Sequence, residues 1–200
     1  MFAVVESGSI TSFPKGNKGL VVGDVKHPKT IFTLWTEAER NAIGIYTVEI
    51  DETNRKDETF YINTDISYAF GSGKVTGSYG TATAKAIADA NAKDENGDDL
   101  DPVVVIKGLK TKYKENFNAQ AAGLLLPTDW YVVKATEISG YSVPSAITTY
   151  RAAVRTKVNA METAIDNCAN VEALITLLEY TINDAGVTSR PLGEFPNEVI

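Results

Sequence analysis

Two neighbouring stretches decide the fold of this chain: Gly123-Leu-Leu-Leu-Pro-Thr-Asp-Trp-Tyr-Val-Val-Lys134 and Val143-Pro-Ser-Ala-Ile-Thr-Thr-Tyr-Arg-Ala-Ala-Val-Arg155. Pro127 has no N–H and biases Leu126 away from the α region, so we expect one helix to end there. Thr128 or Asp129 then caps the next helix by accepting a bond from a free backbone N–H. The two stretches predict a helix, a proline corner, a second helix, a short loop and a third helix.

The third of these helices has the clearest apolar pattern. Its apolar residues recur at steps of three and four, which is the spacing of a helix buried on one face: Ile147, Tyr150, Val154, Val158, Met161 and Ile165. Ser145 is its expected N-cap, and Arg151 lies off the stripe. A similar period predicts a helix within 103–126, and Asn170 is expected to cap a last helix.

Residues 1–84 have the pattern of a small β module. Short apolar runs alternate with turn residues, which predicts a meander of antiparallel strands at 2–5, 10–13, 20–22, 45–50, 59–62, 67–70 and 74–79. We interpret the glycine-containing segment 15–19 as a hairpin loop. Thr36-Glu-Ala-Glu39 has the form of a capping box and predicts one short helix that stops at Gly44.

These patterns predict the α+β class: a small antiparallel β-rich N-terminal module with one short helix, a helical C-terminal part of three to four helices, and an extended tail. The expected organisation is a β module at 1–84, an acidic linker at 85–102, a helical domain at 103–180 and a tail at 181–200.

Composition excludes several classes of function. The 200 residues carry a net charge of −7, so the chain lacks the basic surface that a general nucleic-acid binder needs. No apolar run approaches the roughly 18 residues of a membrane span, and the N-terminus has no signal-peptide pattern. One cysteine, Cys168, and one histidine, His27, leave no disulfide or cysteine-based metal site.

The acidic segment 94–101 was weighed as a calcium loop. Asp94 and Asn96 precede Gly97, but Val103 stands where the glutamate of such a loop belongs. We interpret the segment as a solvated turn. The sequence therefore predicts no catalytic residue, no cofactor and no metal, and we expect a protein that is not an enzyme.

Several segments resemble a group of small tailed-bacteriophage proteins. The resemblance lies in Met1-Phe-Ala-Val-Val-Glu-Ser-Gly-Ser-Ile10, Thr36-Glu-Ala-Glu-Arg-Asn-Ala-Ile-Gly-Ile45, Lys56-Asp-Glu-Thr-Phe-Tyr61 and the two stretches quoted first. It covers about residues 1–180, and the acidic insert at 92–102 departs from it. Proteins of this group are described as tail-fibre assembly proteins, which are chaperone-like, or as tail proteins of the virion.

The resemblance implies a virion protein of the viral tail, assembled in the host cytoplasm, that contacts other tail or fibre proteins as a homo- or hetero-oligomer. The net charge and the lack of a long apolar run argue against a nucleic-acid or membrane partner. A tail-fibre assembly chaperone that is absent from the mature particle is the alternative. The expected interaction residues are large apolar side chains at the corner, on the third helix and in the tail: Trp130, Tyr131, Tyr150, Leu192 and Phe195.

Two further hypotheses remain open from the residues alone. The first is a receptor- or glycan-binding module, because tryptophan and tyrosine rings stack on sugars. The second is a hydrolase that pairs carboxylates among Asp129, Glu137, Glu162 and Asp166, although nothing in their order places two of them in one cleft. We also expect Trp130 to anchor the core at the proline corner, and residues 181–200 to reach a neighbouring subunit.

Overall fold

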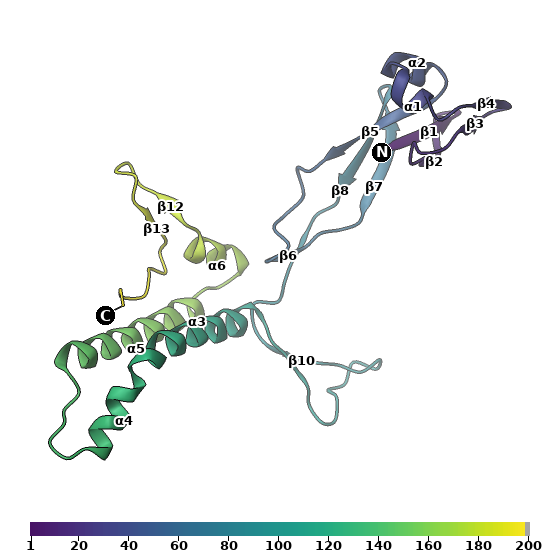
Figure 1. Cartoon of the computed structure of the whole chain (residues 1–200). Helices are drawn as coiled ribbons and strands as arrows, with labels where there is room; N and C mark the ends of the chain where they lie inside the picture. The colour runs from purple at the N-terminus through teal and green to yellow at the C-terminus, as the bar shows by residue number, and fades with distance from the viewer. Residues whose placement is uncertain (199–200) are drawn as a thin grey trace. The chain divides into compact units, whose positions relative to one another are not determined.

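The computed structural model describes residues 1–198 and divides the chain into two compact units, Met1–Thr83 and Ala84–Ile200 (Figure 1). The first unit is rich in strands and the second is mostly helical, which confirms the expected α+β class. The division lies beside the expected boundary at residue 84, and the acidic segment 85–102 is part of the second unit.

The first unit is built on a five-stranded sheet. Its strand order is β2 (Ser9–Ser12), β1 (Phe2–Glu6), β5 (Ile45–Asp51), β8 (Lys74–Tyr79) and β7 (Ile66–Gly71). The pairs are antiparallel except β5 with β8, which is parallel, so the sheet is not the simple meander expected. Phe13, just after β2, packs its ring against Tyr68 of β7 with 4.6 Å between centroids, so the two edge strands approach one another.

Both faces of the central strands are buried, because side chains alternate along a strand. One face forms a core cluster of Ala3, Val5, Val48 and Val75. The opposite face forms a second cluster of Val4, Ile31, Phe32 and Ile45, against which the hairpin of β3 (Leu20–Val22) and β4 (Val25–His27) and the short helix α1 (Ile31–Leu34) are packed.

Helix α2 (Glu37–Ala42) confirms the expected capping box. The Thr36 hydroxyl accepts a bond from the Glu39 N–H, the Glu39 carboxylate accepts one from the Thr36 N–H, and Gly44 has a φ of 80°. Strand β4 and helix α1 were not expected. The hairpin-loop interpretation of 15–19 is wrong, because β2 pairs with β1 and β3 pairs with β4. Two short strands, β6 (Tyr61–Ile62) and β9 (Thr83–Ala84), pair with each other.

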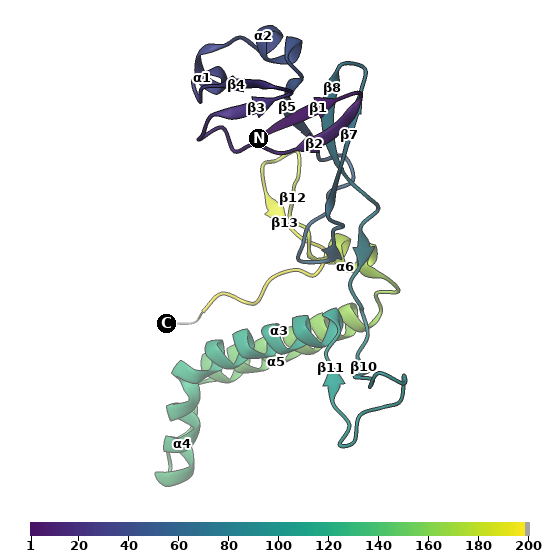
Figure 2. The same ribbon diagram turned by 90° about the vertical axis from the view of Figure 1, so that its right-hand side faces the viewer.

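The second unit is built on two antiparallel helices, α3 (Leu109–Leu125) and α5 (Ser145–Asp166), which lie side by side (Figures 1 and 2). All six residues of the predicted apolar stripe on α5 are buried. Helix α6 (Val171–Leu178) follows, and the Asn170 side chain accepts a bond from the Ala173 N–H as expected of its cap. Cys168 lies in the short connection between α5 and α6. Its side chain is buried, and burial raises the pKa of its thiol.

Helix α3 begins at Leu109, later than the start of the segment 103–126 in which we expected a helix. Its first N–H groups are bound by the preceding chain: Leu109 and Lys110 donate to the carbonyls of Ala86 and Ile87, and the Gly108 N–H donates to the Asp89 carboxylate. A side chain at Gly108 would meet the Ala88 backbone at 2.4 Å. Residues 103–106 instead form an extended arm, with β11 (Val105–Ile106) paired to β10 (Ala90–Asn91).

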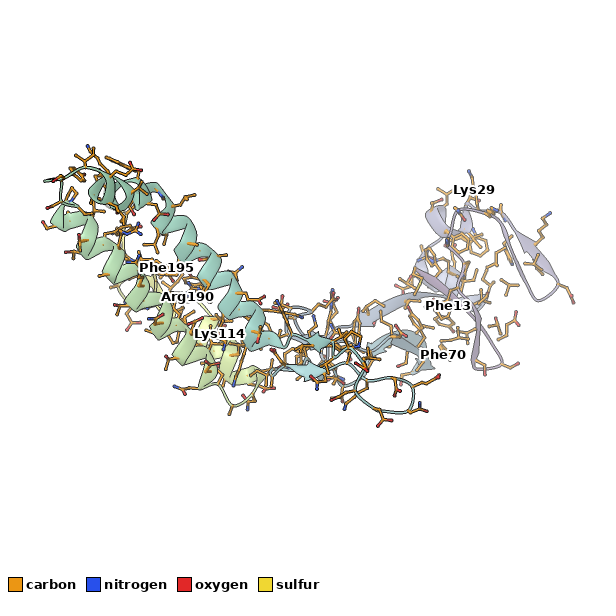
Figure 3. All side chains as sticks on the ribbon, turned by 90° about the horizontal axis from the view of Figure 1, so that it is seen from below. Phe13, Lys29, Phe70, Lys114, Arg190 and Phe195 are labelled. Carbon is orange, nitrogen blue, oxygen red and sulfur yellow. The ribbon has the colours of Figure 1, made fainter. Side chains whose placement is uncertain are left out.

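The C-terminal segment folds back onto its own unit instead of extending away. Strands β12 (Thr181–Ile182) and β13 (Thr188–Ser189) form a hairpin. After it, Leu192 is buried and donates its N–H to the Leu177 carbonyl, while the Lys157 ammonium donates to the Leu192 carbonyl at 2.7 Å. The Arg190 guanidinium lies over the Phe117 ring, and Figure 3 shows Arg190 and Phe195 beside the helices.

Candidate interaction surface

The predicted helix, proline corner and second helix are confirmed: α3 ends at Leu125, Pro127 lies in the corner, and a new helix begins at Asp129. Two details of the corner differ from the prediction. Leu126 has α-helical angles, and Leu126–Thr128 form a 3₁₀ turn, η1, that leads directly into α4 (Asp129–Glu137). Thr128 occupies the N-cap position of α4, but its hydroxyl donates to the Leu125 carbonyl and makes no cap bond. Pro127 therefore lies in a 3₁₀ turn that joins α3 to α4 without a loop, and α4 bends away from α3 (Figures 1 and 2).

The free carbonyls of this corner are satisfied by α5. Because the Asp129 N–H bonds to Leu126 in the 3₁₀ turn, the Leu125 carbonyl loses its usual helical donor. The Arg151 guanidinium replaces that donor at 3.0 Å, and the same nitrogen reaches the Thr128 hydroxyl at 2.6 Å and the Asp129 carboxylate at 2.7 Å. Arg151 is only 8 % exposed, so a single buried cation fixes the direction of α4.

Tyr150, the neighbour of Arg151 on α5, completes this joint. Its hydroxyl donates to the Leu124 carbonyl at 3.4 Å, and its ring is buried. Burial raises the pKa of the Tyr150 phenol, with a smaller contribution from the Glu198 carboxylate. The joint between α3, η1 and α4 is therefore held by two consecutive residues of α5.

Helix α4 has no buried residue. Three exposed apolar side chains recur at spacings of four and three across η1 and α4, with exposed fractions of 69 % for Leu126 in η1 and of 51 % for Trp130 and 53 % for Val133 in α4. We call these three residues the α4 face. The Trp130 ring lies against the Tyr131 ring with centroids 3.7 Å apart, and the Lys134 ammonium lies 5.7 Å from the Trp130 ring.

The expected interaction residues separate into two groups. Trp130 is exposed and Tyr131 and Phe195 are half-buried. Tyr150 and Leu192 are 3 % and 4 % exposed, so a partner does not reach them in this conformation, and their expected role in a contact stays a prediction. The expectation that Trp130 anchors the core is wrong. Trp130 lies on the exposed side of α4 and is not part of the buried core.

Sequence reasoning did not single out Arg151, Leu126 or Val133. A usable signal for Arg151 was its position directly after Tyr150 in the predicted helix. A long, positively charged side chain at this position can reach backbone carbonyls that lose their helical donors at a proline corner. The usable signal for the α4 face was the spacing of Leu126, Trp130 and Val133 at four and three residues.

Three of the four carboxylates considered for hydrolysis make structural contacts. Asp129 pairs with Arg151 near the start of α5, whereas Asp166 pairs with Lys114 at the other end of that helix, 2.8 Å apart. The Glu162 carboxylate accepts from the Asn118 amide. The hydrogen bond from Lys114 to Asp166 is the main reason that the pKa of Lys114 is raised.

The acidic segment forms a turn whose geometry is set by its own backbone. The Asp94 carboxylate accepts bonds from the Asn96 and Asp98 N–H groups, and these contacts lower the pKa of Asp94. Within residues 1–198, no group of three or more histidine, cysteine, aspartate or glutamate side chains is arranged to hold a metal ion. Among the described helices, none has the length and apolar character needed to cross a bilayer.

Comparison with known proteins does not identify the chain: no family model matches the sequence, and neither a curated protein nor a solved structure matches it.

Proposed function

We propose that the protein is a non-enzymatic structural protein of a tailed bacteriophage, carried in the tail or at the tail-fibre attachment, and that it acts through contacts with other tail proteins. The observation that carries the proposal is α4, a nine-residue helix without a buried residue. It lies within one of the segments that resemble the phage tail group. The protein is assembled in the host cytoplasm and then stays in the virion.

The chemistry of the α4 face supports a protein partner. Tryptophan is among the residues that dominate the free energy of binding at protein interfaces, and a cluster of exposed apolar side chains on one helix is the typical anchor for a groove on a partner. Arg151 holds the helix in a fixed direction, so little conformational entropy is lost when the face is covered.

The alternative is a tail-fibre assembly chaperone, and the small size of the α4 face favours it. A single helical face buries less surface than the roughly 1,200–2,000 Å² of a stable interface, so this surface by itself suits a partner that is released. The two roles differ in one observable: a structural subunit remains in the finished particle, and a chaperone does not.

The experiment measures the chain in purified particles of the phage that encodes it. We expect quantitative mass spectrometry to find a fixed copy number per particle. Absence of the chain from infectious particles contradicts the structural role and supports the chaperone.

A variant pair then tests the α4 face itself. Trp130→Glu places a charge on the face, whereas Thr136→Glu places one on the same helix outside it. We expect Trp130→Glu to be lost from particles while its circular dichroism spectrum is unchanged, and Thr136→Glu to be incorporated normally. Equal incorporation of both variants shows that the contact lies elsewhere on the protein.

A further inference from the structure

The hairpin arm of the second unit exposes apolar side chains on both faces. Val103, Val104, Val105 and Ile106 are 59 %, 50 %, 53 % and 58 % exposed, and successive side chains on a strand point to opposite faces. A two-stranded hairpin has no core of its own and is only marginally stable in water. A run of four exposed apolar residues is therefore expected to be covered by another surface.

The arm is anchored firmly at its base. The Gly108 N–H donates to the Asp89 carboxylate at 2.8 Å, and the Ala92 N–H donates to the Val104 carbonyl at 2.7 Å. Further along, Lys93 pairs with Asp99 across the hairpin. Figure 2 shows the arm projecting from the pair formed by α3 and α5. It is therefore an ordered projection of the second unit.

The arm is also strongly acidic. Residues 90–106 contain five carboxylates and one lysine, which gives a net charge of −4. Three of the carboxylates, Glu95, Asp98 and Asp101, are exposed and take part in no ion pair within residues 1–198. A surface that covers the arm is therefore expected to combine apolar and basic side chains.

The first unit carries a surface of that kind on the hairpin of β3 and β4. Leu20 and Val22 pack inward against the core, while Val21 and Val25 are each 57 % exposed. Residues 14–29 contain four lysines and one aspartate, a net charge of +3. Within the described part of the chain, no ion pair includes these exposed lysines, which are Lys15, Lys18, Lys26 and Lys29.

We propose that the acidic arm of one copy (residues 90–106) docks on the basic hairpin of a second copy (residues 14–29). The two surfaces are different, so the contact is heterologous: each copy offers one arm and one hairpin, and the contact repeats head to tail into a ring or a filament. This inference goes beyond the proposed function, because it concerns contacts between copies and holds with or without a phage particle.

The two surfaces match in kind as well as in charge. Each is a two-stranded antiparallel hairpin with unpaired outer backbone groups, and each carries exposed valines. Pairing of such edges adds main-chain hydrogen bonds, while the valines exclude water between them. The charges then fix which hairpin pairs with which, since arm-to-arm contact brings like charges together.

Charge reversal tests the proposal in the full chain. One variant carries Lys26→Glu and Lys29→Glu, a second carries Glu95→Lys and Asp98→Lys, and a third carries all four changes. Analytical ultracentrifugation over a concentration series, at low and high salt, measures association. The control carries Lys56→Glu and Lys112→Glu, two exposed lysines outside both hairpins.

We expect the wild type and the control to associate, with weaker association at high salt. Each two-site variant is expected to associate at least tenfold more weakly, on the scale of the coupling measured for close charge pairs. A mixture of the two variants and the four-site variant are expected to recover association. A wild type that stays monomeric over the concentration series overturns the proposal. Chemical cross-linking that joins the arm only to the hairpin of its own chain overturns it as well. So do reversal variants that match the wild type, and a four-site variant that fails to recover.

Discussion

Replacement of Arg151 by methionine is the most direct perturbation of the joint that directs α4. Methionine keeps much of the length and apolar stem of the side chain but removes the guanidinium. The change leaves the Leu125 carbonyl with only the Thr128 hydroxyl as donor and leaves the Asp129 carboxylate unpaired. Because Arg151 is buried, no water replaces it directly.

The size of the effect follows from these contacts. A hydrogen bond to a charged group contributes about 1.5–3 kcal/mol, and removal of one partner of a buried pair costs about 3–5 kcal/mol. The Asp129 side chain is 51 % exposed and stays hydrated in the variant, so the lower part of this range applies. We expect Arg151→Met to lower the free energy of unfolding by about 2–3 kcal/mol.

Urea denaturation followed by circular dichroism measures the free energy of unfolding, and amide hydrogen exchange of residues 129–137 measures whether α4 opens locally. Arg155→Met is the matched control. It lies one turn further along α5, is exposed, and makes no hydrogen bond or ion pair among the described residues, so we expect a change below about 0.5 kcal/mol. Equal stability and equal exchange in Arg151→Met and the wild type refute the argument.

Three further changes follow from the positions of single side chains. Trp130→Ala is expected to lower the free energy of unfolding by less than about 1.5 kcal/mol, because the ring is half exposed; thermal denaturation that shows the 3–5 kcal/mol of a core aromatic contradicts this. Leu192→Ala is expected to lower the free energy of unfolding of the isolated chain by about 2–4 kcal/mol, because Leu192 is buried against its own unit. An unchanged melting temperature contradicts this and favours the original expectation that the tail contacts a neighbouring subunit. Bonds from Thr111 and Gly108 lower the pKa of Asp89, so its contribution to stability is present above the ordinary pKa of an aspartate and is lost as pH falls through the lowered value. In Asp89→Asn we expect that part of the acid-induced loss to be absent, which urea titrations between pH 2 and pH 5 measure; an acid response identical to the wild type contradicts it.

The spacing of apolar residues within a single helix was enough to predict which of its side chains are buried. The stripe on α5 and the caps at Thr36 and Asn170 depend on residues three or four apart, and they were correct. The expected cap at Ser145 was wrong, because Ser145 is the first residue of α5 and Pro144 occupies the cap position without a side-chain bond. The parallel pairing of β5 with β8 was not predictable in this way, because it joins strands that are separated along the chain. The start of α3 was not predicted for the same reason. The Ala86 carbonyl and the Asp89 carboxylate accept bonds from backbone N–H groups at the start of this helix in place of a local cap, and no rule based on neighbouring residues predicts such contacts.

The corner at Pro127 explains why Trp130 is not the core anchor that we expected. A proline removes one N–H donor, and the local rule treats that loss as the end of the helix. The helix ends before Pro127, and the Arg151 guanidinium of α5 binds the Leu125 carbonyl, so α4 begins in a new direction with Trp130 half exposed. From one buried position Arg151 satisfies the Leu125 carbonyl, the Thr128 hydroxyl and the Asp129 carboxylate, and these contacts offset the free-energy cost of burying its charge. These contacts hold α4 in a direction in which none of its residues is buried, and that exposure is the basis of the proposed contact with a partner.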